Sequence, residues 1–136
     1  MTNWKDRLVP DEFNRLKDNE ILVFMSNLDG RHQGFSGAFA IQNGAIYGKG
    51  WGVAGHTYAI PIVDSRLKSL SLKSIASHIL DFINFAKEHK DFNFLVYHLD
   101  NKMREIAPLF SDSIDVPNIF LPKEVWYIIN NKNKIL

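Results

Sequence analysis

The chain has 136 residues, of which 46% are hydrophobic and 23% charged, and its formal net charge is +1. These values are typical of one globular domain, whereas a nucleic-acid or anionic-membrane surface would require clustered Lys and Arg. The absence of cysteine excludes disulfides and thiolate metal sites. The apolar runs are shorter than a membrane span of about 20 residues, and the polar N-terminus does not resemble a signal peptide. We therefore expect a soluble, cytoplasmic protein.

The first third of the chain is predicted to hold one buried strand and two short helices. Asp11–Asp18 favours a helix, which would belong to a helical extension over residues 1–19. Ile21–Met25 is apolar without alternation, which is typical of a strand buried on both faces. A turn is expected at Ser26–Gly30, and the small residues of Ser36–Gln42 favour a helix.

The middle of the chain combines a glycine-rich segment with a strand and the clearest helix. Gly44–Gly55 holds five of the eight glycines and predicts an irregular loop. Thr57–Val63 predicts a strand, and Pro61 would place it at a sheet edge or at a strand end. Ser71 is a natural N-cap for a helix that extends to about His89, with apolar residues at helical spacing.

The last third of the chain continues the alternation of strands and helices. Phe92–Tyr97 and Asn118–Leu121 are predicted strands, with an amphipathic helix at Asn101–Phe110 between them. A final helix is expected from Lys123 to about Asn130, followed by a frayed tail over residues 131–136. The order of elements predicts a single-domain α/β fold, with a mixed sheet covered by helices on both faces.

All eight glycines lie between Gly30 and Gly55. The first three, with Arg31 and His32, separate the buried strand from a helix, which is where α/β sheets bind ligands. Glycine lets a phosphate approach the backbone, and Arg31 can add a charged contact; the alternative is a flexible turn. The residues predicted to bind a ligand are Ser26, Asn27, Gly30, Arg31, His32, Gly34, Gly37, Tyr47, Gly48, Gly50, Trp51 and Gly52.

The other candidate motifs are less specific. Gly50–Gly55 matches GxGxxG, but a strand rather than a helix follows it, so a Rossmann dinucleotide site is not expected. Trp51 and Tyr47 are either a stacking lid for a base or structural anchors. The five histidines lack metal-ligand spacing, so we expect neither a metal nor a cofactor.

Three aspartates, Asp29, Asp64 and Asp100, each follow a predicted strand. Each can be a general base or an ordinary turn residue. Among the residues of the glycine loops, Asp29 and His32 are the candidates for catalysis.

Several segments carry a resemblance to a known family. They are Val23–His32, Gly44–Gly50 and Thr57–Pro61, with further counterparts at Phe94–Tyr97, Glu105–Phe110 and Asn118–Trp126. These segments resemble small bacterial and phage proteins related to macrodomains, whose pattern reads roughly VFGSNLAGRHGAGAA…GAIYGQGEGLQGQSYAIPTKD. The resemblance covers residues from about 20 to 126. It implies a macrodomain-like domain that binds ADP-ribose or a related nucleotide through the loops at Ser26–Gly37 and Gly44–Gly55.

The chain also departs from that pattern. Met25 and Asp29 replace a glycine and an alanine, and Gln33 interrupts a His-Gly pair. Tyr97–Lys102, which has no glycine, stands where the family carries a second glycine loop around the phosphates and distal ribose.

The expected function is therefore the binding of an ADP-ribose-like or cyclic signalling nucleotide rather than catalysis. In a phage or bacterial defence setting, such binding would sequester a signal, and a homo-oligomer with shared pockets would suit that task. The alternatives are an ADP-ribosyl or nucleotide hydrolase and an interaction module with a decayed pocket.

Overall fold

A five-stranded sheet forms the centre of the protein. The computed structural model describes residues 3–10, 15–31, 34–66, 68–97 and 103–134. The strands are β1 (Glu20–Asn27), β2 (Gly52–Ala54), β3 (Thr57–Val63), β4 (Asn93–Val96) and β5 (Ile119–Phe120), in the order β2-β3-β1-β4-β5. β1, β3, β4 and β5 are parallel, whereas β2 pairs antiparallel with β3, so the sheet is mixed.

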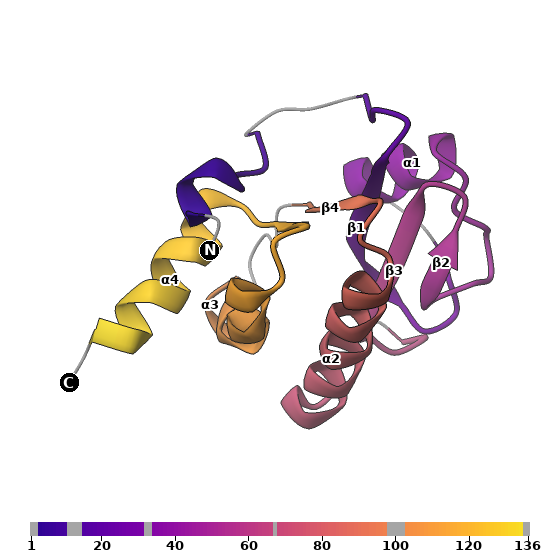
Figure 1. Ribbon diagram of the computed structural model, residues 1–136. Helices are drawn as coiled ribbons and strands as arrows, with labels where there is room; N and C mark the ends of the chain where they lie inside the picture. The colour runs from indigo at the N-terminus through magenta and orange to yellow at the C-terminus, as the bar shows by residue number, and fades with distance from the viewer. Residues whose placement is uncertain (1–2, 11–14, 32–33, 67, 98–102, 135–136) are drawn as a thin grey trace.

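Helices cover both faces of the sheet (Figure 1). They are α1 (Gly34–Gln42), α2 (Leu72–Glu88), α3 (Met103–Ile106) and α4 (Lys123–Lys134), with 3-10 helices η1 (Trp4–Asp6) and η3 (Ala107–Asp115). Leu22 and Phe24 of β1 pack against α1, whereas Ile21 and Val23 face the larger core with α2, η3 and α4. Because successive side chains of a strand point to opposite faces, the continuous apolar run of β1 serves both cores.

The predicted fold class is confirmed, and most predicted elements are found near their expected bounds. β1, β3, β4, β5, α1 and α2 all lie where the sequence predicts them. Ser71 is the N-cap of α2, since its Oγ accepts a 3.1 Å hydrogen bond from the backbone N–H of Ser74. No helix in the described part of the chain is long and apolar enough to cross a membrane.

The predicted helix at Asp11–Asp18 is wrong where the structure describes it, since Arg15–Asp18 is not helical and residues 11–14 lie outside the description. The helical extension over residues 1–19 is therefore confined to the short η1 turn in the described residues. The frayed tail is wrong for residues 131–134, because α4 continues to Lys134.

Two further predictions near prolines need correction. The helix predicted at Asn101–Phe110 is α-helical only over Met103–Ile106, and Pro108, which has no backbone N–H, lies in the 3-10 helix that follows. β3 is an inner strand, so Pro61 does not mark an edge strand; it lies two residues before the end of β3, in agreement with the other alternative. Because Leu22 N donates to His56 O, Pro61 N points away from β1, on the side where pairing with β2 has ended at Ala59.

The loop predicted at Gly44–Gly55 also contains regular structure. Its last part forms β2, which pairs with β3 across a two-residue turn at Gly55 and His56. Val53 lies on the outer edge of the sheet, and Lys49 Nζ donates a 2.6 Å hydrogen bond to its carbonyl oxygen. The lysine thereby occupies a backbone acceptor on the sheet edge.

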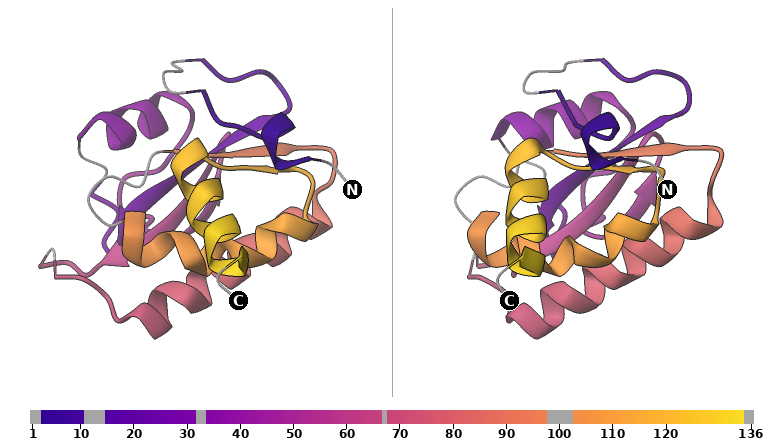
Figure 2. Two further views of the ribbon diagram at one scale, coloured as in Figure 1. Left: turned by 90° about the vertical axis from the view of Figure 1, so that its left-hand side faces the viewer. Right: turned by 60° about the vertical axis from the view of Figure 1, so that its left-hand side comes forward.

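The N-terminal segment packs against the C-terminal part of the chain, beside α4 (Figure 2). Leu8 forms a parallel bridge with Leu121, and Trp4 lies 6.3 Å from Trp126 between ring centroids. Arg7 is only 2% exposed, and its guanidinium lies 4.8 Å from the centroid of the Trp126 ring. The guanidinium nitrogens donate to the carbonyl oxygens of Ser113, Ile114, Val116 and Ile119.

The buried guanidinium of Arg7 donates to carbonyl oxygens of η3 and the following loop, two of which, those of Ser113 and Val116, also accept a backbone N–H. Burial lowers the pKa of the Arg7 guanidinium, and the charge of Asp115 opposes this effect. Since an arginine stays protonated in proteins, the segment carries a buried positive charge at the negative end of η3.

Candidate functional site

The carboxyl ends of β1 and β4 meet at a change in the direction of the chain. From β1 the chain passes through α1 to β3 on one side, and from β4 it passes through α3 and η3 to β5 on the other side. α1 packs on one face of the sheet and α3 and η3 on the other, so the two connections diverge at this point. Open α/β sheets bind ligands in the crevice outside such a switch point.

Ser26 and Asn27 form the end of β1 at this switch point, and Tyr97 directly follows β4. Tyr97 N donates a 2.8 Å hydrogen bond to Val23 O, which joins the end of β4 to the middle of β1, three residues before Ser26. Ser26 is buried, and its Oγ donates to Asn27 O at 3.0 Å. The register between β1 and β3 shifts after Ser26, where the strand opens toward its loop.

The loop between β1 and α1 is closed by the side chain of Asn27. Its Nδ2 donates to Arg31 O at 2.9 Å, and its Oδ1 accepts from Arg31 N at 2.8 Å. Gly30, with φ +68°, donates its N–H to Asn27 O at 3.1 Å. Asn27 and Gly30, both predicted to bind a ligand, therefore fix the backbone of this loop.

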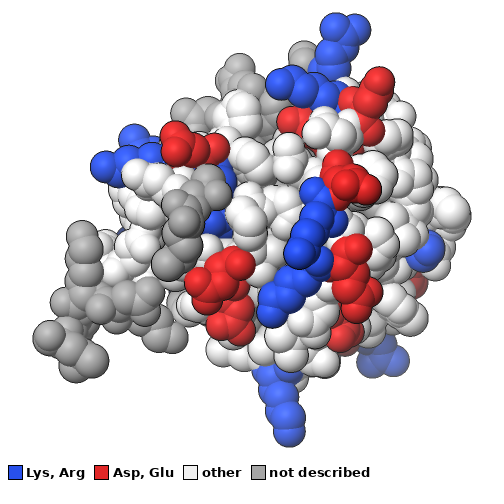
Figure 3. All heavy atoms as spheres, viewed as in Figure 1, with Lys and Arg blue, Asp and Glu red and all other residues white. Residues whose placement is uncertain are grey.

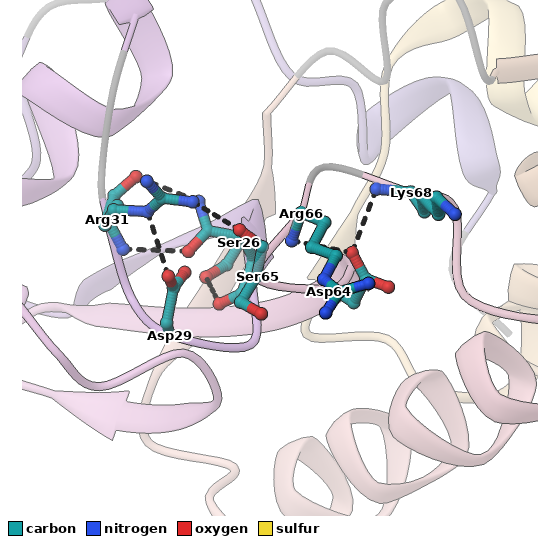
Figure 4. A network of polar contacts seen from close by, with 8 residues as sticks. Ser26, Asp29, Arg31, Asp64, Ser65, Arg66 and Lys68 are labelled. Carbon is teal, nitrogen blue, oxygen red and sulfur yellow. Dashed lines mark hydrogen bonds and ion pairs between the residues drawn. The ribbon is translucent and has the colours of Figure 1, made fainter.

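The Arg31 guanidinium bridges two loops at the carboxyl end of the sheet (Figure 4). Its Nε lies 2.9 Å from Asp29 Oδ2, and its Nη2 donates to the carbonyl oxygen of Ser65, after β3. The side chains of Arg31 and Asp29 are 39% and 36% exposed, so the pair is accessible to solvent. Asp29, the described candidate for catalysis, is thus the ion-pair partner of a neighbouring arginine.

Asp64 is a turn residue in the structure, which favours the structural alternative for this aspartate. Its Oδ1 accepts hydrogen bonds from Arg66 N at 2.8 Å and from Lys68 N at 3.0 Å. Asp100, the last of the three aspartates that follow predicted strands, lies outside the described residues. No local pattern in the sequence identifies Ser65 as a partner of Arg31, whereas an aspartate directly after a strand is a local signal for this turn.

We expect the turn at Asp64 to loosen only in strong acid. The hydrogen bond from Lys68 N is the largest cause that lowers the pKa of the Asp64 carboxyl, and Arg66 N adds to it while desolvation opposes both. A lowered pKa means that the turn is stabilised above the unfolded pKa of about 3.9 and is lost as pH falls through the folded pKa. In NMR titrations, the amide protons of Arg66 and Lys68 should shift with a midpoint below that of unfolded aspartate.

An Asp64→Asn variant is the control for this titration. Its amide has no carboxyl proton to gain, so the same two amide resonances should not shift over this pH range. A midpoint at or above about 3.9 in the unsubstituted protein would contradict the prediction.

Gly30 and Gly50 allow the two glycine-rich loops to pack on each other, and Gly44 and Gly55 allow the two ends of the second loop to meet. A Cβ at Gly30 would lie 2.5 Å from the carbonyl carbon of Gly48, and a Cβ at Gly50 would lie 2.5 Å from Leu28 O. Gly48 N also donates to Gly30 O at 3.0 Å. At the far end of the same segment, a Cβ at Gly44 would lie 2.9 Å from the Cα of Gly55. Close backbone packing therefore explains these glycines.

Tyr47 and Trp51, the predicted stacking residues, are 70% and 55% exposed. The Trp51 ring lies 6.5 Å from the ring of His78 on α2, with 32° between the planes. This contact places Trp51 beside α2. Gly48 and Gly52 have positive φ angles of 94° and 85° with open space around the position of a Cβ.

The structure brings together only part of the predicted site. At the end of β1 and in the loop that follows lie Ser26, Asn27, Gly30 and Arg31, and this loop is contacted by Gly48 and Gly50. The other predicted residues lie elsewhere: Gly34 and Gly37 in α1, Trp51 and Gly52 at the start of β2, and Tyr47 on the exposed surface. His32 lies outside the described residues. None of the twelve residues predicted to bind a ligand lines any of three cavities that described residues form. Within the described ranges, no group of three His, Asp or Glu is placed to hold a metal ion.

A scan against protein-family models, a search of curated proteins and a search of solved structures each gave no match.

Proposed function

We propose that the protein binds a nucleotide-type ligand, ADP-ribose-like or a cyclic signalling nucleotide, at the carboxyl ends of β1 and β4. The observation that carries the proposal is the switch point between these strands, where the connection from β1 through α1 and the connection from β4 through α3 and η3 leave toward opposite faces. This is the position at which open α/β sheets bind nucleotides.

The charges at this end of the sheet suit an anionic ligand. Arg31 forms an ion pair with Asp29 and a hydrogen bond with Ser65, and the exposed residues Arg66 and Lys68 in the following turn add positive charge. The Asp64 carboxylate holds the backbone of this turn, so the two basic side chains extend from a fixed loop. α1 begins shortly after the same loop, and the free N–H groups of a helix start favour phosphate.

The family resemblance of the sequence narrows the ligand class to ADP-ribose and related nucleotides. The sequence Tyr97–Lys102, which follows β4, has no glycine, and binding without turnover is therefore the favoured activity. We place this activity in the cytoplasm of a bacterium or of a phage-infected cell, where the protein would sequester a signalling nucleotide.

Calorimetric titration with ADP-ribose, NAD⁺ and a cyclic dinucleotide tests the proposal. At least one of them should bind with a dissociation constant below about 100 µM, which corresponds to roughly −5.5 kcal/mol. No binding of any of the three at about 1 mM would contradict the proposal.

A Lys68→Gln variant should weaken this binding by about threefold, because one exposed positive charge near a phosphate is lost. The matched control is Lys17→Gln, since Lys17 is also exposed but lies before β1, at the opposite edge of the sheet. Equal losses in the two variants would place the ligand elsewhere.

The two alternatives make different predictions in the same assays. A hydrolase would release product from ADP-ribosylated substrate and would lose that activity in Asp29→Ala, because the described candidate base is Asp29. An interaction module, which the exposed aromatic rings of Tyr47 and Trp51 favour, would bind none of the nucleotides.

A further inference from the structure

A cavity of about 630 Å³ lies at the amino end of β4, whereas the switch point lies at its carboxyl end. Its lining comes from the end of α2, the turn to β4, and the connection between η3 and β5. The residues are Lys87, Lys90, Asn93, Asp115, Val116, Pro117 and Asn118. Asn93 is the first residue of β4, so this cavity is at the amino end of a strand whose carboxyl end belongs to the proposed nucleotide site.

The wall of the cavity is held by Asn118. Its Nδ2 lies 3.0 Å from Ala86 O, 3.1 Å from His89 O and 3.0 Å from Phe92 O. These three carbonyls belong to the last turn of α2 and to the segment that leads to β4. Asn118 therefore joins the two sides of the cavity and fixes their separation.

Two of the charged side chains that line the cavity are lysines, and the third, Asp115, is an acidic group whose charge also acts on the buried guanidinium of Arg7. Lys87, Lys90 and Asp115 make no side-chain hydrogen bond or ion pair in the described part of the chain. Lysines at the end of a helix often bind its last carbonyls. Here Asn118 already donates to the carbonyls of Ala86 and His89, so the lysines are not needed for that purpose. On the face drawn in Figure 3, basic and acidic side chains alternate without forming a patch of one sign.

We propose that this cavity binds a small molecule that carries a phosphate or carboxylate group together with an amine. Lys87, in the last turn of α2, and Lys90, just after it, supply two ammonium groups for the anion. Asp115, from the other wall, supplies a carboxylate for the amine, and the exposed Pro117 gives an apolar surface near it. A concave apolar surface with a few convergent charged groups is the usual form of a small-ligand site.

NMR titrations of the full chain with three probes test this proposal. O-phosphoethanolamine carries both charges, glycine carries a carboxylate and an amine, and inorganic phosphate carries only the anion. The amide resonances of Asn93, Val116 and Asn118 should shift with O-phosphoethanolamine and glycine, and more weakly with phosphate. If neither amine-containing probe shifts these resonances at about 10 mM, the proposal is wrong.

Two pairs of variants assign the charges. Lys87→Gln should weaken binding of O-phosphoethanolamine by about fivefold, which corresponds to about 1 kcal/mol. Lys73→Gln is the matched control, because Lys73 is on the same helix about 21 Å away at about 1.5 Å per residue and does not line the cavity. Equal weakening by the two variants would overturn the proposed site.

Asp115→Asn should remove the preference for O-phosphoethanolamine over phosphate while leaving phosphate binding unchanged or stronger. A preference that survives in Asp115→Asn would contradict the role of this carboxylate. Because the cavity and the switch point lie at opposite ends of β4, the experiment is independent of the nucleotide titration.

Discussion

Replacing Arg7 with methionine is expected to lower the free energy of unfolding by about 3–4 kcal/mol. The substitution removes hydrogen bonds to four carbonyl oxygens at the end of η3 and in the loop to β5. The carbonyls of Ser113 and Val116 keep a backbone donor, so the main loss is at Ile114 and Ile119. Buried carbonyl groups without a donor cost about 1–3 kcal/mol each, and the apolar methionine side chain offsets part of this loss by packing on Trp126. Urea unfolding followed by circular dichroism measures the change, with an unaltered dependence on urea concentration.

Two further variants separate the geometry of Arg7 from its charge. Arg7→Lys keeps the positive charge but not the planar fork, so it should lose most of the same stability. Arg104→Met removes an exposed arginine on α3 and should change stability by less than about 0.5 kcal/mol. If Arg7→Met unfolds at the same urea concentration as the unsubstituted protein, Arg7 does not hold the two halves of the chain together.

A Gly50→Ala substitution should cost about 3 kcal/mol of stability, because its Cβ has no room. The added carbon would lie against Asn27 O and 2.5 Å from Leu28 O, both of which are backbone atoms of the β1–α1 loop. The loop can accept the methyl group only by moving away from the end of β1. We therefore expect Gly50→Ala to disturb the candidate site as well as the fold, which the amide resonances of Asn27 and Arg31 would report.

Gly48→Ala is the matched control for this variant. Gly48 has a φ of +94°, but a Cβ there would meet no atom within 4 Å. The strain of a positive φ costs about 1–2 kcal/mol, and no packing term is added. A cost for Gly50→Ala no larger than that for Gly48→Ala would show that the two glycine loops do not pack tightly.

The elements that could be predicted from the sequence are those whose capping residues and hydrophobic spacing lie within the element itself. The α2 helix has a serine N-cap and an apolar stripe at helical spacing, and β1 is an apolar run. β2 was missed because its three residues have no alternating pattern. The signal in the sequence is the glycine at position 55, because glycine is favoured at the first position of a two-residue hairpin turn, and in the structure Gly55 has a φ of +56° there.

Interactions between distant residues could not be predicted in this way. The four carbonyl partners of Arg7 are between 106 and 112 positions away in the chain, so no local pattern announces them. The same reason applies to Asn118, whose side chain holds the end of α2. The N-terminal segment was predicted as a helical extension, whereas the pairing of Leu8 with Leu121 extends it beside β5.

The clustering of glycines predicts the candidate site, and the structure gives four of the eight, Gly30, Gly44, Gly50 and Gly55, a role in backbone packing. Gly30 and Gly50 allow two loops to touch, which is a requirement of the fold whether or not a ligand is bound. The topology of β1 and β4 is the stronger indication of a ligand site, because open α/β sheets bind ligands at a switch point. The sequence could not predict this switch point, since the order of strands is a property of the folded sheet.

The most direct test of nucleotide binding at the switch point is NMR mapping of the full chain during titration with ADP-ribose. We expect the largest shifts at the amides of Ser26, Asn27 and Tyr97, where β1 and β4 end, with shifts also in the turn of Arg66. Resonances of Asn93 and Val116, beside the amino end of β4, should stay unchanged. Shifts confined to Tyr47 and Trp51, or no shifts at about 1 mM ADP-ribose, would contradict this assignment.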